Sequence, residues 1–266
     1  ATGSGETALP DSMALPIKVN VKHFGIDRLT LRSSESDQVF LGIQFGFTGD
    51  AKRHRYFNLA FSSDFGSVGG EIDLSVTKPY ELDGALDWTL GEAASRVFVH
   101  AALGGTLSRI NGKLIGGVGA LALSGTAVAA PFADSWLPEL TLEARDADLA
   151  NVVATLPKTA LSGNLVAGTD RHGRLAGTLN LTNASAGTWT DMRLPLITIS
   201  TRIAVDGEGL QFDQLKAGLG AGSIITGRGR IAGSATELDM AVANLDLRAI
   251  HKPLRTTKLN GRIKAT

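Results

Sequence analysis

The side chains that most often carry out chemistry are sparse in this sequence and widely separated. The five histidines are His23, His54, His100, His172 and His251, and even the nearest two, His23 and His54, are 31 positions apart. Histidine pairs that bind zinc from one helix or hairpin need a much shorter spacing, so each is expected to be a surface histidine. The chain has no cysteine and no Gly-x-Ser-x-Gly sequence, the contexts that mark common nucleophiles. These residues give no argument for an enzyme, a metal site or a cofactor.

A glycine-rich stretch, KAGLGAGSIITGRGRI over residues 216–231, partly matches a phosphate-binding loop. Gly222 and Gly227 have the required spacing, but Arg228 stands where lysine is needed and Gly229 where serine or threonine would hold a metal. No helical pattern follows. We therefore interpret these glycines as positions where strands bend or pack closely.

The remaining polar groups have simple interpretations. The Arg-His-Arg run at 53–55 is expected to be a solvated hairpin tip, and the Asn-Ala-Ser glycosylation sequon at 183–185 is expected by chance in a chain of this length. Asp146 and Asp148 are explained by helix capping. Basic and acidic residues balance at 26 each, which gives no electrostatic footprint for nucleic acid or for an anionic membrane surface.

Alternation of apolar and polar residues at period two runs through most of the chain and predicts an all-β protein. Examples are Val39, Leu41, Ile43, Phe45 and Phe47, and then Phe57, Leu59 and Phe61. Turns are expected at Gly49-Asp50, Gly69-Gly70, Gly104-Gly105, Asn111-Gly112, Asp206-Gly207 and Asn260-Gly261. Roughly sixteen short strands joined as hairpins would result, too many for an ordinary open sheet to hold without curling.

Two segments are exceptions to this pattern and resemble one another. Residues 137–168 align without a gap on residues 235–266, at an offset of 98. Both halves of the repeat predict a strand, one or two short helical turns opened by Asp148 or Asp246 as N-cap, and a second strand. In the first copy Leu149, Val152, Val153 and Leu156 would form one apolar helical face. The repeat favours an elongated, modular protein.

The uncharged run LIGGVGALALSGTAVAAPFA, residues 114–133, is long enough to span a membrane as a helix. Its Gly-Gly pair and Pro131 are poor helix interior, and Leu121 and Leu123 alternate with alanine. We therefore predict a strand around residues 119–124.

The strands together would carry one very long apolar face, and leaving it in water costs ~25 cal/mol per Å². The sheet must therefore fold over on itself, either to a packed core or to a trough that suits acyl chains. Alternation shows which residues share a face but not whether that face is filled. Each residue could therefore belong to a packed core or to an acyl-chain trough. The candidate lining consists of inward-facing positions: Val19, Val21, Ile43, Phe45, Phe47, Leu59, Phe61, Leu74, Val76, Val97, Val99, Leu121, Leu123, Leu140, Leu142, Leu179, Leu181, Ile197, Ile199, Ile203, Val205, Leu210, Phe212, Met240 and Val242.

Four stretches resemble the TamB family of the Gram-negative cell envelope, within the AsmA-like group of bridge-like lipid-transfer proteins. They are DLANVVATLPKTALSGNLVAG, GTLNLTNASAGTWTDMRLPL, FDQLKAGLGAGSIITGRGRIAG and LDLRAIHKPLRTTKLNGRIKA. The resemblance covers 137–266 well and 15–130 more weakly. It implies a taco-shaped sheet with a continuous hydrophobic groove and phospholipid acyl chains as cargo. It also implies a periplasmic location with inner-membrane anchoring, and the outer-membrane barrel TamA as partner.

This sequence departs from the family in lacking an N-terminal anchor helix and a recognisable C-terminal tail. We therefore expect a segment of a longer protein, with residues 1–14 as linker or poorly ordered and 15–266 as one elongated β-groove unit. Contact with TamA would then involve parts outside this chain.

Two alternatives remain. An assembly factor for outer-membrane proteins and autotransporters would offer a sheet edge to nascent strands by β-augmentation. A β-helix enzyme acting on polysaccharide would need an acid, a base and a cation clustered on an outer face, and no such cluster is found in the sequence.

Overall fold

The structure is a computed structural model that describes residues 9–32, 37–91, 96–118, 121–151, 155–170, 173–206, 209–233 and 235–265. Within these ranges the chain forms one antiparallel sheet of sixteen strands whose order in space is their order in the sequence. The strands are β1 (Val19–Arg32), β2 (Asp37–Gly49), β3 (Arg53–Ser63), β4 (Gly66–Ser75), β5 (Glu81–Leu90), β6 (Val97–Thr106), β7 (Arg109–Val118), β8 (Leu121–Ala129), β9 (Glu139–Ala147), β10 (Leu161–Thr169), β11 (Leu175–Asn183), β12 (Leu196–Asp206), β13 (Gly209–Leu219), β14 (Ile224–Ala232), β15 (Ala235–Leu245) and β16 (Leu259–Ala265).

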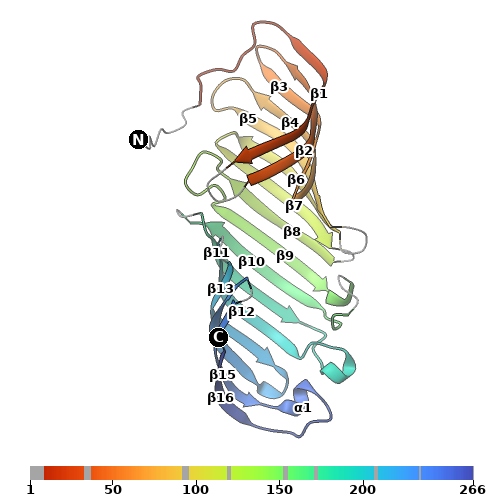
Figure 1. Cartoon of the computed structure of the whole chain (residues 1–266), viewed down its shortest axis with the longest axis vertical. Helices are drawn as coiled ribbons and strands as arrows, with labels where there is room; N and C mark the ends of the chain where they lie inside the picture. Colours follow the sequence, from red (N-terminus) through yellow and green to blue (C-terminus); the bar gives the residue numbers. More distant parts are fainter. Residues whose placement is uncertain are drawn as a thin grey trace.

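The sheet is open, because β1 and β16 each pair with only one neighbour. Figure 1 shows a long twisted ribbon in which the first strands curl out of the plane of the later ones. Short helical turns occur between strands: η2 (Leu149–Asn151), η3 (Trp189–Asp191), η4 (Gly220–Gly222) and α1 (Leu247–Ile250). The prediction of an all-β, elongated and curled sheet with one or two short helical turns is confirmed in its class and openness.

Several glycines expected at turns lie inside strands instead. Gly70 is within β4, Gly105 within β6, Gly112 within β7 and Gly261 within β16. At Gly70 a Cβ atom would lie 2.1 Å from the carbonyl oxygen of Ala85 on the next strand. Such an approach between backbones requires glycine. The turn prediction was wrong at these positions because a glycine that allows close strand packing looks, in sequence, like one that allows a turn.

Two bulges reverse the predicted facing of residues in β2 and β3. Gly42 has a φ of +57° and the register with β3 shifts between Leu41 and Gln44. Leu41 therefore faces the opposite side from Ile43, and its side chain is 45% exposed. A second bulge lies at Asn58, which has a φ of 51°. It turns Phe57 to the side opposite Leu59, where the Phe57 ring covers Gly46.

The two segments of the internal repeat make equivalent hydrogen bonds. The Oδ1 atom of Asp148 accepts hydrogen bonds from the amides of Ala150 and Thr159, at 3.1 and 3.0 Å. Asp246 accepts the corresponding pair, from residues 248 and 257, at 3.0 and 3.1 Å. The hydroxyl of Thr159 donates to the carbonyl of Ala147 at 2.8 Å, and residue 257 repeats this bond at 2.8 Å. Both aspartates are thus capping residues as predicted, while Val152 and Val153 lie outside the described residues.

Residues 1–14 were expected to form a linker or a poorly ordered segment. Residues 9–14 are instead packed against the sheet, and residues 1–8 lie outside the described ranges. Leu9 and Met13 pack against a buried cluster of Leu74, Tyr80 and Leu82. The amide of Met13 also donates to the carbonyl of Val76 at 2.8 Å. We call residues 9–15 the strap, because they cross from the β4–β5 connection to the β2–β3 connection at one long side of the sheet.

Polar contacts hold the strap in place as well. The hydroxyl of Tyr80 donates to the carbonyl of Pro10. Lys78 donates to Asp11 at 2.7 Å, which holds the pKa of that carboxyl below its usual range. The amide of Leu15 donates to the carbonyl of Asp50 at 3.3 Å. The strap therefore closes one side of the sheet where β3, β4 and β5 end.

The uncharged run at 114–133 forms parts of two strands and no helix. It contributes the end of β7 and all of β8. The strand predicted around residues 119–124 is confirmed from Leu121 onward as β8, and residues 119–120 lie outside the described ranges. Among the residues described, no helix is long and apolar enough to cross a membrane.

Candidate functional site

The strand register assigns side chains to the two faces of the sheet, because residues directly opposite one another in an antiparallel ladder share a face. One ladder crosses much of the sheet without interruption: Leu59, Gly70, Leu86, Ala101, Leu114, Gly125, Leu142, Leu165, Leu179 and Thr201. We call the side that carries these residues the apolar face and the opposite side the polar face.

Every residue of the predicted lining lies on the apolar face. Pairing places nearly all of them there, from Val21 opposite Phe47 to Met240 opposite Ile263. Val76 and Ile197 have no directly paired partner, because Val76 lies just beyond the end of β4 and Ile197 lies beside a bulge in β12. Alternation along the chain assigns both of them to the apolar face. The structure thus brings the predicted residues to one surface, although they extend along the whole sheet.

The apolar face carries almost no polar side chain between β4 and β16. The three central ladders, which begin at Val68, Gly70 and Ile72, contain only apolar residues and glycine apart from Thr201. Thr201 is 5% exposed, and its hydroxyl donates to the carbonyl of Asp213 at 3.0 Å. No charge therefore interrupts this surface in the part of the chain that the structure describes.

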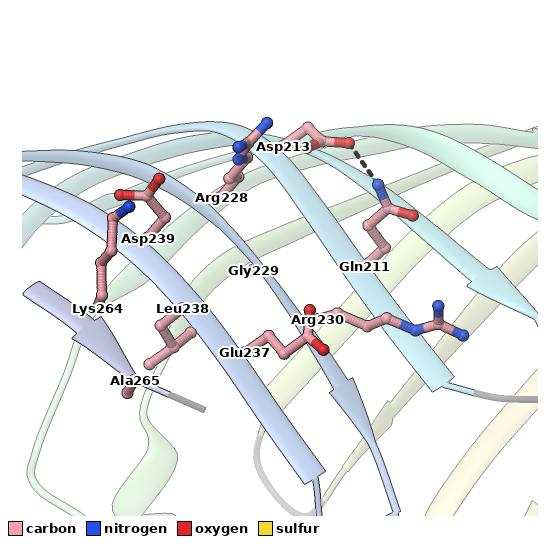
Figure 2. A pocket seen from close by; sticks show the side chains of 10 residues that line it. All are labelled: Gln211, Asp213, Arg228, Gly229, Arg230, Glu237, Leu238, Asp239, Lys264 and Ala265. Carbon is pink, nitrogen blue, oxygen red and sulfur yellow. Dashed lines mark hydrogen bonds between the residues drawn. The ribbon is translucent and has the colours of Figure 1, made fainter.

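The polar face carries the charges. Arg55 on β3 donates to Glu71 on the neighbouring strand β4 at 2.7 Å, and His100 lies 2.8 Å from Asp87. A hollow of about 440 Å³ lies on this face of β13–β16. Figure 2 shows side chains of both charges lining it, among them Arg228 and Asp239. Charges of both signs at exposed positions are typical of a solvated surface.

Among the described residues, the strap covers part of the apolar face, where Leu9 and Met13 pack against Leu74 and Leu82. Apart from two small contacts of η4, with α1 and β15, the substantial contacts among the described elements are those between neighbouring strands. Of the predicted lining only Leu74 and Val76 are buried, whereas Ile197 and Val205 are 41% and 39% exposed. Most of the remaining lining is partly buried in the described part of the chain.

A hollow of about 490 Å³ lies on the apolar face where the first strands curl. This volume is within the range of small-molecule binding pockets. It is lined by aliphatic and aromatic side chains from β1 to β5 and by one connecting residue: Leu29, Leu31, Phe40, Ile43, Phe45, Tyr56, Leu59, Phe61, Ile72, Leu74, Leu82 and Leu107. Aromatic contacts shape part of its wall, with Phe45 5.8 Å from Tyr56 and Phe40 5.8 Å from Phe61 between ring centroids.

The sequence predicted only part of this lining. Phe40 was missed because the bulge at Gly42 puts it, rather than Leu41, on the apolar face. Leu29 and Leu31, which lie opposite Phe40 and Gln38, were not among the predicted residues. A glycine inside an alternating run was the signal available for the first correction.

Beyond the first strands the apolar face continues toward β16. The hollows along β10–β16 open on the polar face, lined by residues such as Asn180, Lys216 and Arg228. A twisted sheet does not curve toward one face along its whole length. One face can therefore be hollow over the first strands while the opposite face is hollow over the later ones. The described chain thus has a continuous apolar surface with an apolar hollow over the first strands.

His54 departs from the prediction of a surface histidine. It lies on the apolar face opposite Leu74, is 7% exposed, and its ring centroid is 5.3 Å from that of Phe47. Its Nε2 atom has no hydrogen-bond partner among the described residues. The run at 53–55 is thus a strand segment whose arginines face solvent and whose histidine is buried.

Asn183 is likewise a buried residue and not an exposed sequon. It is 4% exposed, and its Oδ1 atom accepts from the amides of Ala160 and Ser185 at 3.0 and 3.1 Å. Its amide nitrogen donates to the carbonyl of Leu196 at 3.0 Å. Asn183 therefore ties together the connections beside β10, β11 and β12.

No family model, curated protein or solved structure matches the chain.

Proposed function

We propose that the protein holds phospholipid acyl chains on its apolar face and conducts them between the inner and outer membranes, as a periplasmic protein similar to the TamB family. The observation that supports this most is the long, uncharged apolar face, which no other strand or helix of the described chain covers. Each Å² of such a surface that contacts an acyl chain in place of water contributes ~25 cal/mol. Phospholipid head groups would remain in water beyond the sides of the sheet.

The hollow over the first strands is the best-formed place for an acyl chain. The strap and Leu107 close it at one long side, whereas Leu31, 49% exposed, lies toward the other. An acyl chain would enter from the open side and could pass onto the apolar ladders that continue toward β16. The barrel protein TamA is the partner that the family resemblance implies, and nucleic acid is not expected.

The alternative, an assembly factor that pairs with nascent strands, finds less support at the free edge of β1. That edge is 14 residues long, but a register shift between Val21 and Phe24 interrupts it, and it carries Arg28 and Arg32. Bulges and charges on an edge strand hinder the addition of another strand.

The test is to purify the chain from a Gram-negative host, extract it with organic solvent and identify phospholipids by mass spectrometry. We expect phospholipid in near-stoichiometric amounts. A protein that is empty after gentle purification and takes up no lipid from vesicles would contradict the proposal.

A further inference from the structure

Three loops on one long side of the sheet form a continuous surface that the groove does not explain. Their described residues are 148–151 and 155–160 after β9, 184–195 after β11 and 246–258 after β15, and Figure 1 shows the three loops projecting from the same side of the sheet, the last of them at α1. The amide of Lys158 donates to the carbonyl of Met192 at 2.8 Å, which joins the first loop to the second. Thr190 Oγ1 lies 3.0 Å from His251 Nδ1 and joins the second to the third. We call the exposed residues of these loops the loop rim.

The loop rim exposes large apolar side chains on each of its three loops. Trp189 is 46% exposed, Met192 59%, Leu156 38% and Leu254 43%. They come from all three joined loops, so the apolar surface is shared along the rim. Tryptophan and large aliphatic residues among cations are typical of proteins that lie at the boundary between water and lipid.

The loop rim also carries an excess of positive charge that the balanced composition of the whole chain conceals. The three loops contain six basic residues, Lys158, Arg193, Arg248, Lys252, Arg255 and Lys258, against three acidic ones, Asp148, Asp191 and Asp246. The difference, six minus three, is a net charge of +3. All six basic residues are exposed.

The acidic residues of these loops are engaged within the loops. Asp148 and Asp246 accept backbone hydrogen bonds as caps. Asp191 accepts from Lys252 at 2.5 Å and from Thr188 at 2.8 Å, and these two contacts hold its pKa below the usual range. Among the described residues no acidic partner lies within 4.0 Å of the other five basic side chains, so these cations face solvent.

We propose that the loop rim binds the surface of a bilayer that contains anionic phospholipid, with Trp189, Met192 and Leu254 in the interfacial layer and the basic residues against the head groups. Charge complementarity favours this occupant, because each lysine or arginine near an anionic surface contributes roughly 1 kcal/mol. The proposal concerns a different surface from the apolar face and does not depend on lipid binding there.

The test is flotation of the full chain with vesicles of 30% phosphatidylglycerol in phosphatidylcholine, compared with vesicles of phosphatidylcholine alone. We expect binding to the anionic vesicles that weakens as salt is added, and little binding to the neutral ones. Arg193→Gln with Arg255→Gln should lower the partition coefficient about 25-fold, since each lost cation reduces it about five-fold. Quenching of tryptophan fluorescence by brominated lipid should decrease in Trp189→Phe.

The matched control is Arg228→Gln with Arg262→Gln, two exposed arginines on the polar face. This variant should bind vesicles within two-fold of the unaltered protein. Failure to bind anionic vesicles, equal binding to neutral ones, or an equal loss in both double variants would overturn the proposal. A variant with a carboxylate on the apolar face should still bind vesicles, so this result and the result for lipid in the groove are separable.

Discussion

A carboxylate placed on the apolar face should abolish lipid binding without unfolding the sheet, and Leu59 is the most informative position. Its side chain lines the hollow, and its cross-strand partner on β4 is Gly70. Because glycine offers no side chain to pack against, Leu59→Asp removes little packing between these two strands. The next residue, Ala60, lies opposite Gln44 and Gly69 on the polar face and provides the control.

The expected loss follows from two terms. A fully buried leucine contributes about 1.5–3 kcal/mol. Leu59 is partly buried already, so it would gain about a third of that, up to about 1 kcal/mol, when an acyl chain covers it. Holding an ionised carboxylate against hydrocarbon costs several kcal/mol, of which we count about 2. The sum of about 3 kcal/mol corresponds to more than a 100-fold lower affinity.

The assay is equilibrium binding of a fluorescent phospholipid to the unaltered chain, Leu59→Asp and Ala60→Asp, with circular dichroism to verify strand content. We expect the first variant to lose binding and the second to remain within two-fold of the unaltered protein. Equal binding by all three, or an equal loss in both variants, would refute the assignment of the two faces.

Three further changes test the structural reasoning by urea unfolding. Gly125→Ala places a Cβ atom 2.0 Å from the carbonyl of Thr141 and should cost about 1–3 kcal/mol, whereas Gly261→Ala meets open space and should change stability by less than about 0.5 kcal/mol; equal effects would contradict the close approach. His54→Phe should raise stability by about 1 kcal/mol because it removes a buried nitrogen without a partner, and a loss of stability would mean that Nε2 makes a hydrogen bond. Asp148→Ala and Asp246→Ala should each cost about 1 kcal/mol, and clearly different costs would contradict the equivalence of the two repeats.

The sequence could predict the two-faced sheet because side-chain parity is a local property. Alternation assigned Leu140 and Leu142, or Ile203 and Val205, to the same face correctly, since no bulge intervenes. It failed wherever one residue is inserted, as at Gly42 and Asn58, because a single extra residue reverses every side chain beyond it.

Other features depend on contacts between distant parts of the chain. The strap is held by Tyr80 and Lys78, about 70 positions away, and no local pattern marks the segment as packed. The burial of His54 depends on neighbouring strands and is equally invisible in the sequence. Whether the apolar face is filled could not be predicted either, because parity indicates which residues share a face and not what covers them.

The repeat was predictable in more detail than the rest. Its capping aspartates and the paired threonines fix the same backbone hydrogen bonds in both copies, from Asp148 with Thr159 to Asp246 with Thr257. Local polar contacts of this kind depend on particular residue types, so the same residues recur 98 positions later in the sequence.

The most direct test of the central claim is photocrosslinking to lipid in intact cells, at neighbouring residues that face opposite ways. A benzophenone amino acid would replace Leu142 or Ile203 on the apolar face, and Glu143 or Ala204 on the polar face. The account predicts phospholipid adducts at Leu142 and Ile203 and none at Glu143 and Ala204. Adducts at all four positions, or at none, would contradict an apolar face that carries acyl chains along the sheet.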